Sequence, residues 1–391
     1  MRILFVHDRC GWLGGVEQNV SDSAAGLRER GHSCFLAHGP DTDRDPDGFR
    51  AGFDGAWPAR ECGAGDRTVA EVAIGCRADV VYYHKIPRLP DRVPTGIASV
   101  RMVHDHDLCC PRSHKYHLID SSVCRHRADW RCWLDLAFLA RTGPLPWGLS
   151  LVSIPAHAAE MRRNRDRIDR VLVGSRFMRD ELLDNGFAAD RVSVLPPAAR
   201  LRVPEAVREP EGDTVLFVGQ LIRGKGADLL LRALSGLAVP FHAVLAGDGN
   251  ARPSLQELAA GLGLRDRVTF AGFVSHDAID RLYAEARVVV VPSRWPEPFG
   301  MVGVEAAFHG RPVVAFEVGG IPDWLRHGEG GLLVPEGDVA GLSVALGRVL
   351  AEPGLAAALG RRGRARAALD FAFDRLVDGL ERALRDAMGA G

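Results

Sequence analysis

Lysine is scarce in this chain of 391 residues. Only Lys85, Lys115 and Lys225 occur among the 49 basic side chains, and the remaining 46 are arginines. A lysine that persists in so arginine-rich a sequence is a candidate for a specific task. Cysteine is absent after residue 132, and the eight cysteines before that point are scattered rather than gathered in a small disulfide-rich module. We therefore expect reduced thiols, as in a cytosolic protein.

Long apolar runs and an excess of either charge are also missing. No uncharged apolar stretch approaches the roughly 20 residues that a membrane span requires, and no secretion signal is visible near Met1. The 49 basic side chains balance 50 acidic ones, so no strong field attracts a polyanion. We expect a cytoplasmic protein with no nucleic-acid partner, and any membrane contact would be peripheral, at the inner membrane face.

The length and the apolar pattern predict two α/β domains, residues 1–200 and 213–370, joined by a linker rich in proline and charge between Leu195 and Asp213. Short apolar runs predict buried strands at 3–6, 34–38, 80–83, 99–103, 171–174, 215–218, 242–246, 268–271, 288–291 and 312–316. Because predicted helices alternate with these strands, we expect doubly wound parallel sheets. A last amphipathic helix within 371–391 is expected to pack back on the first domain, with Phe371, Leu376, Leu380 and Leu384 on its apolar face.

Residues 292–305 carry the densest signal, Pro-Ser-Arg-Trp-Pro-Glu-Pro-Phe-Gly-Met-Val-Gly-Val-Glu, directly after the predicted strand 288–291. A helix that begins near Gly300 would leave the amides from Phe299 to Val302 unpaired at the positive end of the helix dipole, which suits a phosphate. Glu297 and Glu305 flank this turn, where their carboxylates can accept hydrogen bonds from sugar and ribose hydroxyls. An isolated pair of glutamates is more often a loop charge and a solvated helix residue, but this context favours a site.

A second glycine-rich turn follows the predicted strand 215–218. It reads Gly-Gln-Leu-Ile-Arg-Gly-Lys-Gly, from Gly219 to Gly226. Arg223 and Lys225 can reach a diphosphate together, and a binding role outweighs the ordinary surface role because lysine is so rare here. A third turn, Gly247-Asp248-Gly249, follows the predicted strand 242–246. We expect it to lie alongside the glycine-rich turn from Gly219 to Gly226.

These motifs resemble those of the retaining glycosyltransferases of family 4, which have the GT-B fold. The family's paired glutamates with seven residues between them match Glu297 and Glu305, its Gly-Lys-Gly matches residues 224–226, and Gly-Gly-Ile-Pro-Asp at 319–323 matches a further stretch. The resemblance is strongest over residues 215–338. It implies two Rossmann-like domains that face each other across a cleft, acceptor side first, and transfer of a sugar from a UDP- or GDP-sugar to a hydroxyl acceptor such as a glycan, a lipid-linked molecule or a small molecule.

The resemblance also implies roles for single residues. Lys225 would bind the donor diphosphate, Glu305 the ribose, and Glu297 the hydroxyls of the transferred sugar. The donor site would further include Gly14, Gly15, Gln220, Gly247, Phe273, Val274, Phe299, Gly300, Met301 and Val302, with Phe273 and Val274 lining the base pocket and Gly14 and Gly15 in a phosphate-approaching loop. His104 matches the family's histidine near the reacting anomeric carbon.

Two positions depart from the family pattern. Gln220 stands where an arginine usually follows the strand glycine, and Pro197-Ala198 stands where asparagine-glycine is common. Since departure of the diphosphate needs positive charge, we expect Arg223 to compensate for Gln220.

The stretch from Cys109 to Cys132, directly after His104, is rich in cysteine and histidine. We interpret it as a loop that faces the acceptor, with Arg112, His114 and Lys115 as contacts. A zinc site at Cys110, Cys124 and Cys132 is the alternative, but the spacing lacks the short cysteine pairs of ordinary zinc modules.

Five arginines fall within residues 162–170 and could attract an anionic membrane or acceptor. The acidic residues interleaved with them, Glu160, Asp166 and Asp169, favour a solvated helix face instead.

The expected mechanism needs no metal and no other cofactor. The two domains close over the substrates, and Lys225, Arg223 and the helix amides stabilise the leaving nucleoside diphosphate. The anomeric configuration is retained by front-face attack, and Glu297 is only a weak candidate for a nucleophile. Three other functions stay open: a nucleotide-sugar epimerase of the same fold, a retaining phosphorylase or synthase that builds a glucan, which this chain length disfavours, and a catalytically silent nucleotide-sugar-binding protein, which Gln220 would suit.

Overall fold

The computed structural model describes residues 1–91, 96–117, 122–145, 149–198, 200 and 212–389. The chain divides into two compact units: the first comprises Met1–Asp120, Cys124–Arg200 and Phe373–Gly391, and the second comprises Ser121–Val123 and Leu201–Ala372. The change of unit at residues 200 and 201 falls in the predicted linker, of which residues 199 and 201–211 lie outside the described part of the chain.

A seven-stranded parallel sheet forms the centre of the first unit, in the order β3-β2-β1-β4-β5-β8-β9. Its strands are β1 (Arg2–His7), β2 (Ser33–His38), β3 (Gly55–Pro58), β4 (Val80–Tyr83), β5 (Ala98–Val103), β8 (Arg170–Val173) and β9 (Val192–Val194). A separate antiparallel hairpin joins β6 (Leu139–Leu145) and β7 (Leu149–Leu151). The helices are α1 (Gly15–Glu29), α2 (Pro46–Ala51), η1 (Arg60–Cys62), α3 (Val69–Gly75), α4 (Arg131–Leu134), α5 (Ile154–Arg167), α6 (Arg176–Asp184) and α14 (Phe373–Gly389).

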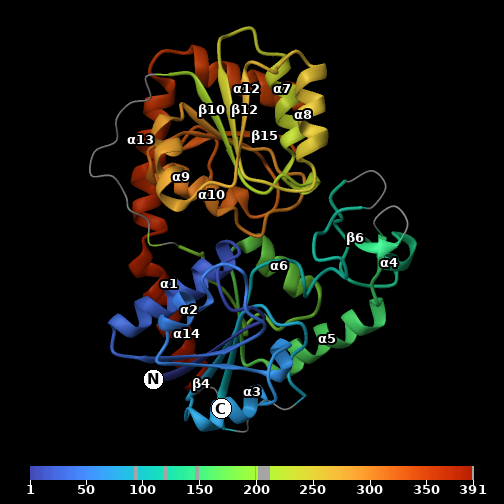
Figure 1. Cartoon of the computed structure of the whole chain (residues 1–391), viewed down its shortest axis with the longest axis vertical. Helices are drawn as coiled ribbons and strands as arrows, with labels where there is room; N and C mark the ends of the chain where they lie inside the picture. The colour runs from blue at the N-terminus through green and yellow to red at the C-terminus, as the bar shows by residue number, and fades with distance from the viewer. Residues whose placement is uncertain (92–95, 118–121, 146–148, 199, 201–211, 390–391) are drawn as a thin grey trace. The chain divides into compact units, whose positions relative to one another are not determined.

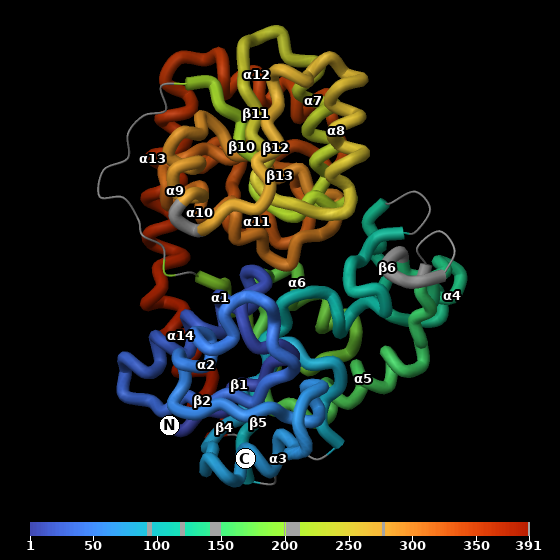
Figure 2. The backbone as a smooth tube through the Cα atoms, viewed as in Figure 1, coloured from blue at the N-terminus to red at the C-terminus, as the bar shows by residue number. Residues whose placement is uncertain are grey.

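The second unit is built on a six-stranded parallel sheet in the order β12-β11-β10-β13-β14-β15. Its strands are β10 (Thr214–Val218), β11 (His242–Ala246), β12 (Val268–Gly272), β13 (Val288–Val291), β14 (Val313–Phe316) and β15 (Gly331–Val334), and Figure 2 shows β10 to β13 side by side. The helices are η3 (Arg223–Lys225), α7 (Ala227–Ser235), α8 (Arg252–Gly261), α9 (His276–Glu285), α10 (Met301–Phe308), α11 (Ile321–Trp324), α12 (Val339–Ala351) and α13 (Leu355–Asp370).

Both sheets form because their strands are short apolar runs that helices cover on two faces. All four valines of β13 are buried, as are all four residues of β4 and of β14, so these strands are apolar along their whole length rather than at alternate positions. Strand, helix and parallel strand can connect only by crossovers, which gives the doubly wound arrangement. The predicted α/β class with two Rossmann-like sheets is confirmed.

Helix α14 returns the end of the chain to the first unit, where it lies beside α1 (Figure 1). Leu376, Leu380 and Leu384 share one buried cluster with Ile3 and other residues of β1. Phe371, which the sequence pattern placed on the same apolar face, packs instead in the core of the second unit. The reason is that α13 ends at Asp370 and α14 begins only at Phe373.

Five strands went unpredicted: β3, β9 and β15 of the parallel sheets, and β6 and β7 of the hairpin. The three in the parallel sheets are very short. β3 reads Gly-Ala-Trp-Pro, β9 has three residues, and β15 opens with a glycine. Among the described residues, no single helix is long and apolar enough to cross a membrane.

Candidate functional site

The candidate site of the second unit lies where the strand order of its sheet reverses. β10 and β13 are neighbours in the sheet, and the chain leaves them in opposite directions along it. The loops after two such strands diverge and leave a crevice at the carboxyl edge, which is where doubly wound sheets bind ligands. Both glycine-rich motifs follow these two strands, because Gly219 comes directly after β10 and Pro292 directly after β13.

The two loops are locked together through their backbones. Gly226 has φ of +71°, and a Cβ there would lie 1.8 Å from the carbonyl oxygen of Pro292, so only glycine fits. The amides of Arg294 and Trp295 both donate to the carbonyl oxygen of Gly224, at 2.9 and 3.1 Å. Arg294 also forms a two-pronged ion pair with Asp228 at 2.5 and 2.6 Å.

This frame brings Lys225 onto Glu297. The Nζ of Lys225 donates to the Oε1 of Glu297 at 2.7 Å, and the hydroxyl of Ser293 donates to the same oxygen at 2.5 Å. The ammonium lies 5.4 Å from the ring centroid of Trp295, within cation–π range. The carboxylate of Glu297 is nearly buried, whereas the side chain of Lys225 keeps 27% of its surface exposed. The cation is therefore positioned by the protein and still open to an anionic ligand.

Glu297 is held in its ionised form. Burial alone would raise the pKa of its carboxyl, but the charge and hydrogen bond of Lys225 and the hydrogen bond from Ser293 outweigh burial, and the pKa is lowered. A carboxylate that already accepts two hydrogen bonds on one oxygen can still accept sugar hydroxyls on the other.

The Gly-Gly-Ile-Pro-Asp stretch supports the backbone of Glu297. Gly319 has φ of +61°, and a Cβ there would lie 2.4 Å from the carbonyl oxygen of Glu297. The amide of Gly320 donates to that same oxygen at 2.7 Å. The Gly-Gly-Ile-Pro-Asp motif therefore fixes the main chain of Glu297, the candidate catalytic residue.

Helix α10 begins at Met301, after Gly300 in the left-handed region at φ of +94°. The Gly303 amide bonds back to the Gly300 carbonyl, so Met301 and Val302 carry the amides that can reach an anion. Phe299 is buried against Phe371, with ring centroids 5.5 Å apart, and its carbonyl oxygen accepts from Trp324 at 2.6 Å. Its side chain is therefore a core residue, and only its amide remains for the predicted role.

Glu305 is oriented by a buried tyrosine. The hydroxyl of Tyr283, on α9, donates to the Oε2 of Glu305 at 2.9 Å. Burial, followed by the charge of Glu305, raises the pKa of this tyrosine, so it stays protonated and remains a donor. The carboxylate is thereby fixed on the partly exposed face of the first turns of α10.

Gln220, which stands in place of the family's arginine, and Arg223, which is expected to compensate for it, both face solvent. Gln220 and Arg223 are exposed, and within the described residues no side chain pairs with the Arg223 guanidinium. Its backbone carbonyl accepts from Arg294 at 3.3 Å, which fixes the main chain at this point. A long arginine side chain on a fixed backbone is free to turn toward a ligand.

Gly247 and the base-pocket candidates lie at the same edge of the sheet. A Cβ on Gly247 would lie 1.9 Å from the carbonyl oxygen of Gly219, so the turns after β10 and β11 touch backbone to backbone. Phe273, directly after β12, keeps 67% of its surface exposed, and Val274 is half-buried. An exposed aromatic ring at a sheet edge offers a stacking surface.

A buried histidine cluster occupies the corresponding edge of the first unit. His7 ends β1, and His84 and His104 follow β4 and β5. The Nδ1 of His84 and the Nε2 of His104 are 2.9 Å apart, and their rings stack with centroids 5.2 Å apart. Burial, and next the charge of His7, lowers the pKa of His104 to about 3. His104 is therefore neutral at ordinary pH and can donate or accept a hydrogen bond but carries no charge.

This shift predicts a pH dependence of stability. In the unfolded chain a histidine titrates near about 6.5, so below that pH the unfolded state binds a proton that folded His104 does not, and stability falls as pH falls toward 3. Between pH 7.5 and pH 5 this one group should cost about 2 kcal/mol. Urea unfolding at pH 7.5 and pH 5 measures this effect. Between the two pH values, the free energy of unfolding should fall by about 2 kcal/mol less in His104→Gln than in the unmodified protein. An equal fall in both proteins would contradict the low pKa of His104.

Gly14 and Gly15 precede and begin α1. A Cβ on Gly15 would meet nothing within 4 Å, so the fold itself does not require glycine there. The amide of Gly14 donates to the carboxylate of Glu17 at 2.7 Å, and the other oxygen of Glu17 lies 3.1 Å from the Nε2 of His7. In the described state Glu17 thus occupies an amide that the sequence assigned to a phosphate.

The acceptor candidates divide into different environments. Lys115 is buried, and its ammonium bonds Glu181 at 2.7 Å and the carbonyl oxygen of His126 at 2.5 Å, so the protein's own groups already hold the ammonium that the sequence assigned to an acceptor. Arg112 is also buried, and His114 stacks on Tyr116 with centroids 4.1 Å apart. Burial and the charge of Arg112 lower the pKa of His114 to about 4. Arg112 and His114 stay candidates for acceptor contacts only if the acceptor reaches into the interior of the first unit.

Residues 202–366 match the family described as Glycosyl transferases group 1. The matched residues lie within the second unit, and none of them belongs to the first unit. The sequence relatives of this chain include the D-inositol 3-phosphate glycosyltransferase of Acidothermus cellulolyticus, 36% identical over 243 residues, which are 56% of this chain and 54% of the relative. The α-D-kanosaminyltransferase of Streptomyces kanamyceticus is 35% identical over 161 residues, 40% of this chain and 42% of the relative. The chain thus matches about half the length of these curated relatives.

Solved structures similar to this chain are GT-B proteins. Sucrose-phosphate synthase from Thermosynechococcus elongatus aligns over 100% of both chains with a TM-score of 0.76 and 19% identity. Anabaena HepE, crystallised with UDP-glucose, covers 99% of this chain and 100% of its own, with a TM-score of 0.72 and 20% identity. At such identities the likeness shows the fold, which is GT-B.

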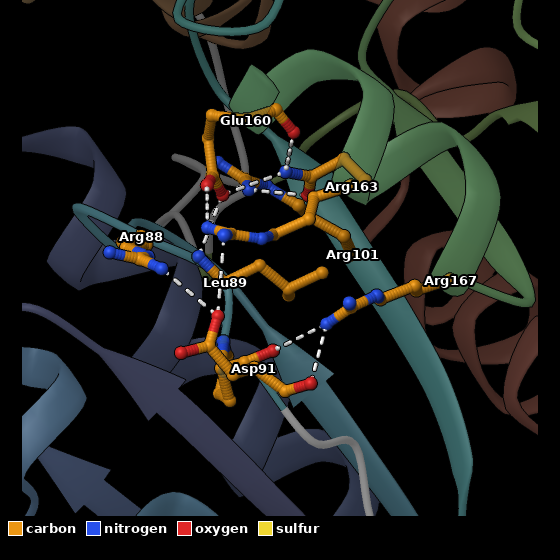
Figure 3. A network of polar contacts seen from close by, with 9 residues as sticks. Arg88, Leu89, Asp91, Arg101, Glu160, Arg163 and Arg167 are labelled. Atoms are coloured by element: carbon orange, nitrogen blue, oxygen red, sulfur yellow. Dashed lines mark hydrogen bonds and ion pairs between the residues drawn. The ribbon is translucent and has the colours of Figure 1, made fainter. Parts of the chain in front are cut away.

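The arginine-rich helix α5 of this glycosyltransferase-like chain is largely occupied by local partners (Figure 3). Arg163 pairs with Asp91 at 3.3 Å, and Arg167 donates to the carbonyl oxygen of Asp91 at 2.6 Å. Glu160 accepts from the amide of Leu89 at 2.6 Å. The helix thus secures the segment 88–91, in agreement with the solvated-face interpretation.

Sequence reasoning missed four partners of the site. Ser293, Trp295, Tyr283 and His84 each contact a predicted residue, as described above. Ser293 and Trp295 lie inside a recognised motif and could have been considered with it, whereas Tyr283 and His84 carry no pattern that distinguishes them from core residues.

Proposed function

We propose that this chain is a retaining glycosyltransferase that moves a sugar from a nucleotide-sugar donor to a hydroxyl acceptor without a metal ion. The observation that carries the proposal is the Lys225–Glu297 pair, held at the strand-order reversal of the unit that matches the group 1 glycosyltransferases. A partly exposed cation, free helix amides and a buried carboxylate converge there, which suits a diphosphate linked to a sugar.

The proposed roles follow from the local geometry. Lys225, Arg223 and the amides of Met301 and Val302 would stabilise the charge that develops on the leaving diphosphate. Glu297 would hold hydroxyls of the transferred sugar and Glu305 those of the ribose. Phe273 would stack on the base, with Val274 beside it, and neutral His104 would contact the transferred sugar by a hydrogen bond.

UDP-sugars are the first donors to test, because HepE was crystallised with UDP and with UDP-glucose. The acceptor would be a glycan, a lipid-linked molecule or a small molecule. The cytosol would keep the eight unpaired thiols reduced, and any membrane contact would be peripheral.

A two-stage experiment tests the function. The full-length protein is first screened by thermal shift against UDP, GDP and a panel of their sugars. The donor that raises the melting temperature is then incubated with acceptor mixtures, and release of nucleoside diphosphate, transfer and anomeric configuration are followed by mass spectrometry and NMR. An unchanged melting temperature with every nucleotide, from a protein shown to be folded, would sink the donor site.

The absence of a charge at Gln220 favours a second candidate, a protein that binds nucleotide sugars without turnover. Donor binding with no transfer to any acceptor would support it. A Gln220→Arg variant that then acquired donor hydrolysis or transfer would identify the missing charge as the cause.

Removing Glu305 should weaken donor binding. A charged group that accepts a ribose hydroxyl contributes about 1.5–3 kcal/mol, so Glu305→Ala should raise the Kd for the nucleoside diphosphate by about 10- to 150-fold. Isothermal titration calorimetry measures this directly. Tyr283→Phe keeps the ring and removes only the hydroxyl that orients Glu305, so a smaller rise is expected. Glu285→Ala, on the exposed face of α9, is the matched control and should leave the Kd unchanged.

A further inference from the structure

His84 links the buried core of the first unit to the partly exposed ring of His104. The Nδ1 of His84 lies 2.9 Å from the Nε2 of His104. His84 directly follows β4 and is only 1% exposed, whereas His104 directly follows β5 and is half-buried. A half-buried ring can contact a substrate, but a ring as buried as that of His84 can act on one only through its neighbour.

The core of the sheet holds the ring of His84 in place. This ring lies nearly parallel to that of Phe5 on β1, with centroids 5.6 Å and planes 11° apart, and it meets the ring of Tyr82 edge to face with centroids 4.3 Å apart. The main-chain amide of His84 donates to the carbonyl oxygen of Val6 at 2.9 Å. The position of His84 is therefore set by β1 and β4, and His104 is oriented against a fixed partner.

A single hydrogen can lie between the two facing ring nitrogens. Burial, followed by the charge of His104, lowers the pKa of His84 well below its ordinary value, and the pKa of His104 is lowered to about 3. Both rings are therefore neutral at ordinary pH. A neutral imidazole carries hydrogen on one nitrogen and accepts with the other. One ring must donate to the other, and the direction of this bond fixes the tautomer of both.

The other nitrogen of His84, Nε2, indicates the direction. It is buried and has no hydrogen-bond partner among the described residues. If His104 donated, the hydrogen of His84 would lie on this Nε2, as a buried N–H without an acceptor. If His84 donates from Nδ1, its Nε2 keeps only an unpaired lone pair. Buried N–H groups without a partner are the rarer case in proteins, so the second direction is favoured.

This direction leaves His104 with its hydrogen on Nδ1. Within the described part of the chain, the contact with His84 is the one hydrogen bond of the His104 ring, and it uses Nε2. An oxygen of a bound sugar that reaches Nδ1 would then meet a fixed donor, rather than a ring that turns or changes its tautomer. A donor held in one orientation before binding loses little freedom when the substrate arrives.

We propose that His84 is a positioning residue for sugar transfer, which donates from its Nδ1 to His104 and so keeps the Nδ1 of His104 as a hydrogen-bond donor toward the transferred sugar. The inference rests on the function proposed above and on the contact that His104 makes there. His84 itself does not touch the substrate, because its ring is buried.

Nitrogen NMR of the unmodified full-length protein tests the tautomers without any substrate. In protein labelled with nitrogen-15 in its histidines, long-range proton–nitrogen correlations distinguish a ring nitrogen that carries hydrogen from one that does not. The signals that disappear in His84→Asn and in His104→Gln identify the two rings. We expect hydrogen on Nδ1 of both. Hydrogen on the Nε2 of His104 overturns the proposal, whatever the activity of the protein.

Two substitutions separate positioning from packing in the steady-state transfer assay. His84→Asn is smaller than histidine but keeps an N–H at the place of Nδ1, whereas His84→Phe fills the space beside Phe5 and cannot donate. We expect kcat/KM within about threefold of the unmodified protein for His84→Asn and a loss of about 10- to 100-fold for His84→Phe, the size of effect that misplacement of a substrate contact produces.

A packing role would reverse this order, because phenylalanine replaces the buried ring better than asparagine does. If His84→Phe transfers sugar as well as His84→Asn or better, the role of His84 is overturned while the proposed function stands. Absence of transfer by the unmodified protein, with every donor and acceptor, overturns the proposed function and this role with it. The control is His32→Asn, at the amino end of β2, where the ring pairs with Glu381 at 3.0 Å, and it should leave transfer unchanged.

Discussion

Lys225→Ala is expected to lower kcat/KM for sugar transfer by about 10²- to 10³-fold. Removing one preorganised donor from a site where negative charge develops has an effect of that order. Lys225 is such a donor, because Glu297 and the ring of Trp295 fix its ammonium while a quarter of the side chain stays exposed. The measurement is steady-state transfer with the donor that the thermal-shift screen identifies. We expect the loss mainly in kcat, since a bound diphosphate gains charge only as it departs.

The same substitution should also destabilise the second unit, which could be mistaken for the cause. It leaves the buried carboxylate of Glu297 without its cation, at a cost of about 3 kcal/mol, the lower end for a buried pair because Lys225 is partly exposed. The double variant Lys225→Ala with Glu297→Gln removes the unpaired charge and should regain most of that stability without regaining activity. Arg348→Ala, which breaks only an exposed pair on α12, should change neither quantity. A double variant with restored transfer would refute the role of Lys225.

The sequence predicted the second unit better than the first for a physical reason. Its strands are runs such as Val288–Val291, buried on both faces and recognisable from composition alone, and its ligand-facing turns need glycine at fixed places. Gly226 and Gly319 are constrained by backbone atoms of Pro292 and Glu297, so the motif letters record real packing constraints. The positions of Lys225 and Glu297 at a strand-order reversal could therefore be expected from motif and alternation together.

The features of the site that the sequence did not predict depend on contacts between residues distant in sequence. Nothing local to Tyr283 announces that its hydroxyl will meet Glu305, 22 residues away, and nothing local to Lys115 announces Glu181. Lys115 was assigned to an acceptor as part of the loop rich in cysteine and histidine, yet its ammonium lies 2.7 Å from the carboxylate of Glu181, a partner inside the same unit. Rarity of a residue type marks a constraint but cannot say whether that constraint is functional or structural.

Gly226→Ala should strongly destabilise the second unit. The added Cβ would lie 1.8 Å from the carbonyl oxygen of Pro292, and the residue would also be held at φ of +71°. The loops after β10 and β13 would have to separate, which breaks the hydrogen bonds from Arg294 and Trp295 to Gly224 and moves Lys225 off Glu297. We expect the free energy of unfolding of the second unit to fall by about 4 kcal/mol or more, and donor binding to become undetectable.

Gly337→Ala is the control that separates the steric clash of the added Cβ from the strain of the left-handed backbone. Gly337 has nearly the same backbone conformation, with φ of +73°, but no atom lies within 4 Å of its Cβ position. That variant should lose only the about 1–2 kcal/mol of a left-handed alanine and keep its donor affinity. A chain of two units need not unfold in one step, so hydrogen exchange in peptides that cover β10 and β13 is the measurement to use, alongside calorimetry with nucleoside diphosphate. If Gly226→Ala exchanges and binds like Gly337→Ala, the two loops do not depend on their close contact, and the position of Lys225 must be set by other contacts.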